Sequence, residues 1–439
     1  MAGVVAAAPA FRMPRAPQTI EAAGIPIDLV LQLVTKTLFF AGELSGTELA
    51  SRLGVVFPVV EPSLDQLKRE RHCEIVGGGM VGAPSYRYRL TEAGRARASL
   101  FLDHSNYVGH LPVPHEQYLE YMRRFVRDHP VMVTRDAIRK AFSHLVLSDK
   151  VLDQLGPAVA AWHSLFVYGP PGNGKTVISQ AIRNVLVGDI AIPYALTIDG
   201  HIVRMFDPVI HERVDPLADS LRLGREPDVD FRWVRCRRPQ VTVGGELTMD
   251  ALDLGYSNAT GLYRPPLQAL ANGGVLVVDD FGRQHASPRD LLNRWIVPLE
   301  SRLDYLTLQT GQTFHLPFET FVVFATNLNP SDLVDEAFLR RIQYKVFAQS
   351  PTVEQFIRIF ENCCRTQQLG FDRNLVSTLI ETEIEPRQVQ LRGCQPRDLI
   401  EHALSIASYF NRPRELTLDL LTAACASYFV TDSRVVASA

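Results

Sequence analysis

Two short polar segments carry residue types that can bind phosphate and a divalent cation. The first is Gly169-Pro170-Pro171-Gly172-Asn173-Gly174-Lys175-Thr176, which matches the pattern G-x-x-x-x-G-K-[ST]. Its glycines allow the backbone to approach phosphate groups with N–H groups pointing inward. Its lysine places a positive charge on the terminal phosphates, and its threonine hydroxyl is a ligand for Mg²⁺. The segment therefore predicts a loop that binds the phosphates of a nucleotide.

The second polar segment is the pair Asp279-Asp280, which follows the apolar run Val275–Val278. This pattern indicates a buried strand whose end meets the bound nucleotide. We expect Asp279 to hold Mg²⁺, directly or through water. Asp280 would orient the attacking water or act as a base. The alternative is that the two acids only cap a strand.

The phosphate-binding segment needs a strand before it and a helix after it. Leu165–Tyr168 is an apolar run typical of a buried strand, and Val177–Val187 is expected to form a helix. Such a helix would add the partial positive charge of its N-terminus to the site. This context distinguishes the motif from a glycine-rich turn that arises by chance.

A third apolar run, Phe321–Thr326, ends at Asn327. With the two segments above, it resembles the AAA+ class of P-loop ATPases over roughly residues 156–429. The resemblance implies ATP as the bound nucleotide, Mg²⁺ as its metal, and a role for Asn327 in positioning the attacking water. Most members of the class have glutamate where this chain has Asp280, so the turnover rate stays open.

The resemblance also implies roles for three arginines. The segment 335–341 resembles the part of the class that carries an arginine finger, which would be Arg340 or Arg341, with a slight preference for Arg340. A finger neutralises charge on the γ-phosphate of a neighbouring subunit. Arg397 matches a residue of the helical lid that reaches back to the phosphates. The alternatives are surface arginines at a helix end and, for Arg397, a helix cap or an ion pair.

Residues 291–327 resemble the MoxR-like branch of the class, whose members include ATPases with chaperone activity. Tyr305–Leu308 and Phe314–Leu316 are predicted to form a hairpin with a turn at Thr310-Gly311. The branch places a pore-facing hairpin there, and the alternative is an ordinary edge hairpin.

The fold that these observations predict is α/β: a P-loop three-layer αβα AAA+ core with a C-terminal helical lid, preceded by a winged helix-turn-helix domain. Three helical patterns followed by a strand-like stretch, Ser85–Leu90, are typical of a winged helix. Tyr88–Arg95 resembles the wing and the following helix of MarR-like proteins. The predicted parts are residues 1–25, a disordered N-terminus; 26–113, the winged-helix domain; 114–155, a helical linker; 156–347, the α/β ATPase domain; 348–430, the lid; and 431–439, a tail.

Two regions leave nucleic-acid binding open. The predicted third helix and wing of the winged-helix domain carry Lys68, Arg69, Arg71, Arg87 and Arg89, with acidic residues among them. This mixture fits docking of a protein at least as well as DNA. In the insertion before Gly273, the stretch 231–238 alternates arginines with aromatic residues, which can bind single strands. The preferred interpretation is a twisted strand that pairs with Val241–Val243, with arginines that contact Asp228, Asp230 or a neighbouring subunit.

Composition adds few constraints. The formal net charge is −3, so overall charge does not argue for a polyanionic partner. The six cysteines fit no zinc pattern and are expected to be reduced thiols. The N-terminus is a poor signal peptide, and no apolar run is long enough to span a bilayer. We therefore expect a cytoplasmic protein without membrane insertion.

Three functions remain in competition. The leading hypothesis is an ATP-hydrolysing remodeller, assembled as a homo-oligomeric ring that is expected to be a hexamer, which acts on a protein client. The alternative is an ATP-dependent DNA-binding regulator that uses the winged helix, although the sequence lacks the G-A-F-T-G-A loop of activators that remodel RNA polymerase. A third is a slow nucleotide-dependent scaffold, because Asp280 is one methylene shorter than glutamate.

Overall fold

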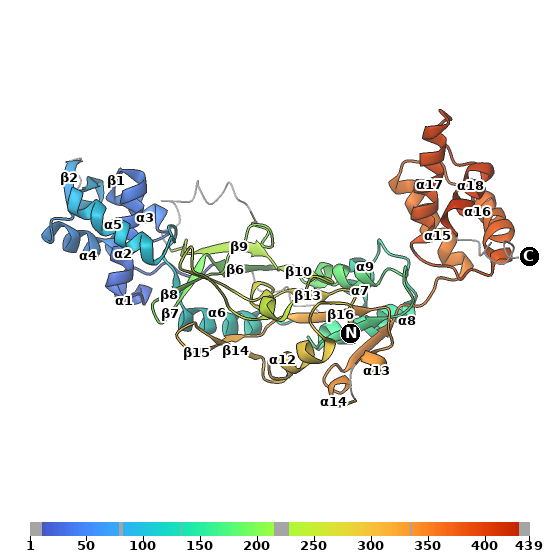
Figure 1. Ribbon diagram of the computed structural model, residues 1–439, viewed down its shortest axis with the longest axis horizontal. Coiled ribbons are helices and arrows are strands. Elements are labelled where there is room, and N and C mark those ends of the chain that lie inside the picture. The colour runs from blue at the N-terminus through green and yellow to red at the C-terminus, as the bar shows by residue number, and fades with distance from the viewer. Residues whose placement is uncertain (1–10, 79–81, 132, 215–227, 334–335, 430–439) are drawn as a thin grey trace, which may run out of the picture. The chain divides into compact units, whose positions relative to one another are not determined.

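The computed structural model describes residues 11–78, 82–131, 133–214, 228–333 and 336–429 (Figure 1). The chain forms two compact units that interleave along the sequence. Unit 1 consists of Met1–Val131, Leu186–Val277 and Gln284–Val322, and unit 2 of Met132–Val185, Val278–Arg283 and Val323–Ala439. This division differs from the predicted domain boundaries, because the region predicted to be one ATPase domain contributes to both units.

The N-terminal part of unit 1 has the predicted order of three helices, a hairpin and a further helix. The elements are α2 (Ile27–Ala41), β1 (Glu43–Ser45), α3 (Gly46–Arg52), α4 (Phe57–Arg69), β2 (Cys73–Gly78), β3 (Tyr86–Leu90) and α5 (Glu92–His104), with the strands in the order β1-β3-β2. A capping box between Ser45 and Glu48 begins α3, which explains why the helix starts there. The helices bury one apolar core, which includes Val30, Leu49 and Leu64.

The prediction of a disordered N-terminus is wrong for residues 11–25. Helix α1 (Ile20–Ala23) begins at a Thr19 cap, and Ala23 is fully buried. Before this helix, the Pro14 carbonyl accepts a hydrogen bond from the Asp230 N–H at 2.9 Å. Backbone hydrogen bonds to a distant segment hold this stretch, and no local sequence pattern reveals such bonds. Residues 1–10 and the predicted tail, 431–439, lie outside the described residues.

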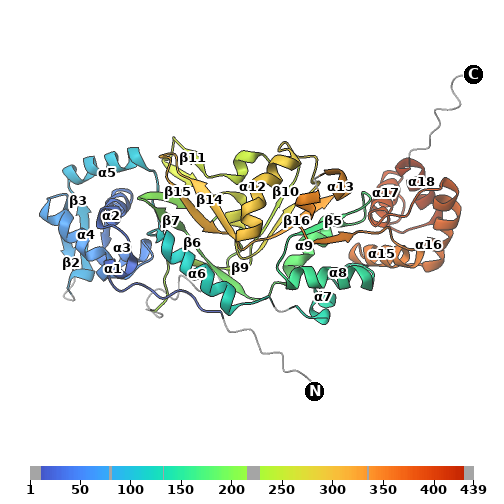
Figure 2. The same ribbon diagram turned by 90° about the horizontal axis from the view of Figure 1, so that it is seen from below.

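The rest of unit 1 combines two small sheets, a hairpin and helix α6 (His115–Asp128), which Figure 2 shows beside β7. The larger sheet has the order β11-β12-β8-β7-β4. Its strands are β4 (Val113–Pro114), β7 (Ala195–Ile198), β8 (His201–Arg204), β11 (Gly255–Ser257) and β12 (Leu262–Arg264). The predicted hairpin is present as β14 (Leu303–Thr307) and β15 (Thr313–Pro317), which pair antiparallel with Tyr305 opposite His315.

One predicted strand pairing is wrong. The stretch 231–238 contains strand β9 (Trp233–Arg237), which pairs antiparallel with β6 (Asp189–Pro193) and not with Val241–Val243. The latter residues belong to β10 (Gln240–Val243), a strand of the parallel sheet described next. Pro239 separates the two strands, and its lack of an N–H and its fixed φ favour a break there.

The strand that leads into the phosphate loop lies between two other strands of a five-stranded sheet. The sheet has the order β10-β13-β16-β5-β17, with β5 (Leu165–Tyr168), β13 (Val275–Val278), β16 (Phe321–Thr326) and β17 (Tyr344–Phe347). Strands β16 and β17 both run parallel to β5, with Val323 and Tyr344 opposite Leu165. The α/β class is confirmed, and all four residues of β13 are buried, as the apolar run predicted.

The C-terminal part of unit 2 is helical, as predicted. The helices are α15 (Val353–Thr366), α16 (Arg373–Leu379), α17 (Gln395–Tyr409) and α18 (Leu418–Tyr428), drawn in orange and red in Figure 1. They share one apolar core. The linker is helical too, with α6 in unit 1 and α7 (Arg135–Ala141) and α8 (Asp149–Ala160) in unit 2. Over the described residues, no helix combines the length and apolar character that crossing a bilayer requires.

Lys36 on α2 leads to a testable prediction about stability. Its side chain is 1% exposed, its Nζ donates to the Ser105 carbonyl at 2.6 Å, and burial lowers its pKa to about 8. The unfolded chain keeps the ordinary lysine pKa, so it binds more protons than the folded chain between pH 8 and 10.5. The free energy of unfolding of this region should therefore rise with pH, by about 2 kcal/mol from pH 7.5 to 9.5.

The Lys36→Met variant should lose this rise. Hydrogen exchange of α2 peptides, corrected for its intrinsic dependence on pH, measures the effect. Lys68→Met is the matched control, because Lys68 is more exposed and pairs with Asp65 at the surface. Equal pH slopes in wild type and Lys36→Met would contradict the argument.

Candidate functional site

The phosphate loop joins buried strand β5 to helix α9 (Lys175–Ala181) within unit 2. The helix begins two residues before its predicted start and ends at Ala181, where a 3₁₀ turn, Ile182–Val185, continues the chain. Gly172 and Gly174 have φ of 81° and 73°, which side chains other than glycine rarely adopt. The loop therefore has the backbone conformation for which its glycines were predicted.

Lys175 is held against its own loop. Its Nζ donates to the carbonyls of Gly169 at 3.0 Å and Pro170 at 2.8 Å, and the residue is 7% exposed. Burial lowers the pKa of Lys175, the negative charges of Asp280 and Asp279 raise it, and the positive charge of Arg392 lowers it. The ammonium group is thus poorly solvated and close to both acids, so an incoming phosphate would meet a cation that lacks its full hydration shell.

Thr176 and Asp279 meet although they are far apart in sequence. The Thr176 hydroxyl donates to Asp279 Oδ2 at 2.7 Å. A hydroxyl oxygen and a carboxylate oxygen in contact are a suitable pair of ligands for Mg²⁺, which keeps its other positions for water and phosphate oxygens. Over the described residues, no group of three or more His, Cys, Asp or Glu side chains is placed to hold a metal ion by itself.

Asp280 and Asn327 are also in contact. The Asn327 amide donates to Asp280 Oδ1 at 3.1 Å, and the Asp280 N–H donates to Asp279 Oδ1 at 3.0 Å. Asp280 is exposed and has φ of 48°, a left-handed conformation that aspartate adopts more readily than most residues. The structure thus brings a carboxylate and an amide together next to the Thr176–Asp279 pair, which can orient a water molecule.

Of the three predicted arginines, Arg340 and Arg397 show no contact with this cluster among the described residues. Arg340 follows helix α14 (Glu336–Leu339) and is exposed, and Lys345 Nζ caps the same turn by donating to the Leu339 and Ile342 carbonyls. Arg341 follows directly, and Asp335 lies outside the described residues. Arg397 donates to Asp398, its neighbour on α17, at 2.8 Å. A finger that acts on another subunit would not contact the phosphate loop of its own chain.

A segment that sequence reasoning missed lies on the phosphate loop. The Cys394 N–H donates to the Gly172 carbonyl at 2.8 Å, and the Gly393 N–H donates to Asn173 Oδ1 at 3.4 Å. The Asn173 amide donates in turn to the Ala348 carbonyl at 3.3 Å. No sequence motif marks residues 393–394, although they stand shortly before the predicted site residue Arg397.

A cavity of about 150 Å³ opens beside the phosphate loop. Its lining shares Asn173, Ile178 and Gly393 with the site and adds apolar and amide side chains from the segments around α8 and α15. The added residues include Val146, Leu147, Val151, Ile359 and Gln355. Apolar walls with a few polar groups suit a flat heteroaromatic ring.

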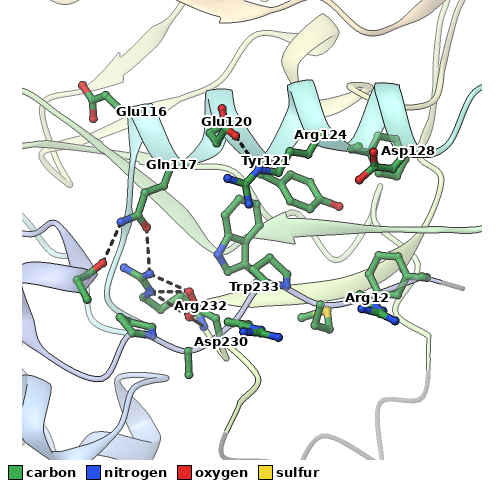
Figure 3. A pocket seen from close by; sticks show the side chains of 18 of the residues that line it. Arg12, Glu116, Gln117, Glu120, Tyr121, Arg124, Asp128, Asp230, Arg232 and Trp233 are labelled. Carbon is green, nitrogen blue, oxygen red and sulfur yellow. Dashed lines mark hydrogen bonds and ion pairs between the residues drawn. The ribbon is translucent and has the colours of Figure 1, made fainter. Parts of the chain in front are cut away.

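A larger cavity, of about 1200 Å³, lies in unit 1 and includes part of the stretch 231–238 (Figure 3). Arg232 is 2% exposed there, and its guanidinium donates to both carboxylate oxygens of the equally buried Asp230, from Nε to Oδ1 and from Nη2 to Oδ2. Figure 3 shows Gln117 of α6 bonded to the same guanidinium, at 3.2 Å. Arg235 pairs with Asp189 at 2.6 Å. These arginines are neutralised within the fold, which favours the structural interpretation over binding of nucleic acid.

This chain is similar to known proteins over part of its sequence and, at low sequence identity, in its structure. Residues 352–427 match a domain of unknown function, DUF8689. No curated protein matches the sequence. The chain is similar to the RuvB Holliday junction branch migration motor of Thermotoga maritima, with 12% identity, a TM-score of 0.37 and coverage of 68% of this chain and 71% of that chain. It is also similar to NtrX of Brucella abortus in complex with ADP, with 16% identity, a TM-score of 0.39 and coverage of 67% and 59%.

The contact between Gly172 and Cys394 gives a prediction for the loop. A Cβ added at Gly172 would lie 2.6 Å from Cys394 Sγ, whereas one added at Gly174 would have no neighbour within 4 Å. Both substitutions impose the same backbone strain, so they form a matched pair. The measurement uses a Cys363→Ser background, because Cys363 is also only partly buried and would react as well. In that background, Gly172→Ala should expose the Cys394 thiol and speed its alkylation several-fold relative to Gly174→Ala. Peptide mapping measures the rate. Equal rates would show that the contact does not hold the thiol.

Proposed function

We propose that this protein binds ATP with Mg²⁺ and hydrolyses it, as a member of the AAA+ class. The observation that carries the proposal is the contact of Thr176 with Asp279, because it joins the phosphate loop to the acidic pair. The glycine conformations and the weakly hydrated ammonium of Lys175 support the same conclusion. The neighbouring cavity of about 150 Å³ would receive the adenine ring.

Each residue of the cluster has a proposed role. The loop N–H groups and the start of α9 cradle the phosphates, and Lys175 neutralises their terminal charge. Thr176 and Asp279 would hold Mg²⁺, which supplies charge neutralisation at the β- and γ-phosphates. Asp280 orients the attacking water, with its own carboxylate positioned by Asn327. Arg340 or Arg341 would complete the site of a neighbouring subunit, which requires an oligomer such as the proposed homo-oligomeric ring.

The client is proposed to be a protein. Wing residue Arg89 pairs with Glu74 at 2.7 Å, Arg87 pairs with Glu43, and Lys68 on α4 pairs with Asp65 at 2.7 Å. These acids offset the basic charges that DNA binding would need, so the observations favour a protein-docking module over a DNA reader. Tyr305 on the β14–β15 hairpin is 54% exposed, which supports contact of that hairpin with a client.

Steady-state phosphate release tests the reaction. Lys175→Ala should abolish turnover, and Asp280→Asn should lower it about 10²- to 10⁴-fold while ATP still binds, because the amide keeps the shape but loses the charge that orients water. Duplex DNA is added to a parallel sample, and turnover should not change. Unaltered turnover in Lys175→Ala would refute the assignment, and stimulation by DNA would favour the regulator.

Mixing two inactive variants tests the finger. Arg340→Ala keeps its own site but lacks the finger, and Asp280→Asn keeps the finger but cannot hydrolyse. Arg340→Ala alone should lose about 10³-fold or more in rate, and Asp280→Asn alone about 10²- to 10⁴-fold. Together they should regain a measurable fraction, because one subunit's Arg340 completes the other's site. Arg341→Ala, mixed in the same way, identifies which arginine acts, and no recovery with either would argue against action between subunits.

A further inference from the structure

The turn at residues 392–394 is fixed to the phosphate loop by its backbone. Its two N–H groups bind the Gly172 carbonyl and the Asn173 side chain, as described above. The Arg392 N–H donates to Gln395 Oε1 at 2.9 Å, which links the turn to the start of α17. Because backbone groups make these contacts, the Arg392 side chain is not needed to hold the turn in place.

The Arg392 side chain lies against the loop without a matching acceptor. Its Cδ would be 3.5 Å from a Cβ at Gly172, so the side chain runs along the face where the loop has no side chain of its own. Its Nε is buried and, within the part of the chain that the structure describes, has no hydrogen-bond partner. A buried guanidinium N–H without an acceptor is costly, and an incoming anion would satisfy it.

Charge leads to the same conclusion. Arg392 is near enough to Lys175 for its charge to act on that ammonium group, so two cations face one loop. Their repulsion is relieved when a polyphosphate lies between them. By contrast, the Arg397 side chain is 63% exposed, and its guanidinium already donates to Asp398.

We propose that Arg392 is a second phosphate-binding cation of the site, which contacts the polyphosphate together with Lys175. The inference rests on the proposed nucleotide function and adds to it a residue outside the motif. Since the 392–394 turn leads directly into α17, a phosphate bound by Arg392 also ties the C-terminal helices to the presence of nucleotide.

Binding measurements on the full chain test this proposal. Affinities for ATPγS, ADP and inorganic tripolyphosphate are measured by calorimetry for wild type, Arg392→Gln, Arg392→Lys and Arg397→Gln. Arg392→Gln should weaken ATPγS and tripolyphosphate about 10- to 100-fold, as expected for loss of a charge-assisted hydrogen bond. Arg392→Lys should recover part of the affinity, because it restores charge but not the planar fork. Arg397→Gln should have the smaller effect.

The outcomes distinguish failure of the proposed nucleotide function from failure of the role proposed for Arg392. If wild type binds neither ATPγS nor tripolyphosphate, the proposed function fails. If wild type binds and Arg392→Gln binds equally well, only the role of Arg392 is overturned. Loss of affinity that Lys does not rescue, together with faster Cys394 alkylation, would show that the side chain has a structural role and would likewise overturn the proposal.

Discussion

The hydrogen bond between Thr176 and Asp279 is the contact on which the site depends. It joins residues 103 positions apart, one at the start of a helix and one at the end of a strand. Carboxyl ends of neighbouring strands meet at one edge of a sheet, and ligands bind there where the strand order changes direction. Strand β5 has later strands on both sides, β16 and β17, so its end is such a point. The same arrangement of strand ends brings Lys175, Asp280 and Asn327 close to this contact.

The parts of the site that the sequence predicted correctly are those in which a local pattern determines the structure. The strands 165–168 and 275–278 have the predicted ends, because each is a short apolar run followed by glycine or acidic residues that end it. The glycines at 172 and 174 have the positive φ that the motif requires. Asn327 lies beside Asp280 because two strands of one sheet end together.

The misses share a physical cause, which is that they depend on contacts between segments distant in sequence. Residues 11–25 lack a strong pattern of their own, yet they bond to residues 228–230. Proximity in sequence predicts Val241–Val243 as the partner of strand β9, whereas the fold pairs β9 with β6. No motif marks the 392–394 turn, whose contacts with the phosphate loop appear only in the structure. Local periodicity determines elements, while tertiary packing determines partners.

The left-handed backbone at Asp280 has a consequence for how this protein can change over evolutionary time. Aspartate tolerates that conformation better than glutamate, because a short polar side chain can bond locally to its own backbone. A mutation to the longer acid would add a methylene and also make the left-handed conformation less favourable. The length of the side chain and the backbone conformation at residue 280 are therefore coupled, so that a change in one affects the other. A lineage that lengthened the acid would change both the reach of the carboxylate and the backbone preference of residue 280 in the same step.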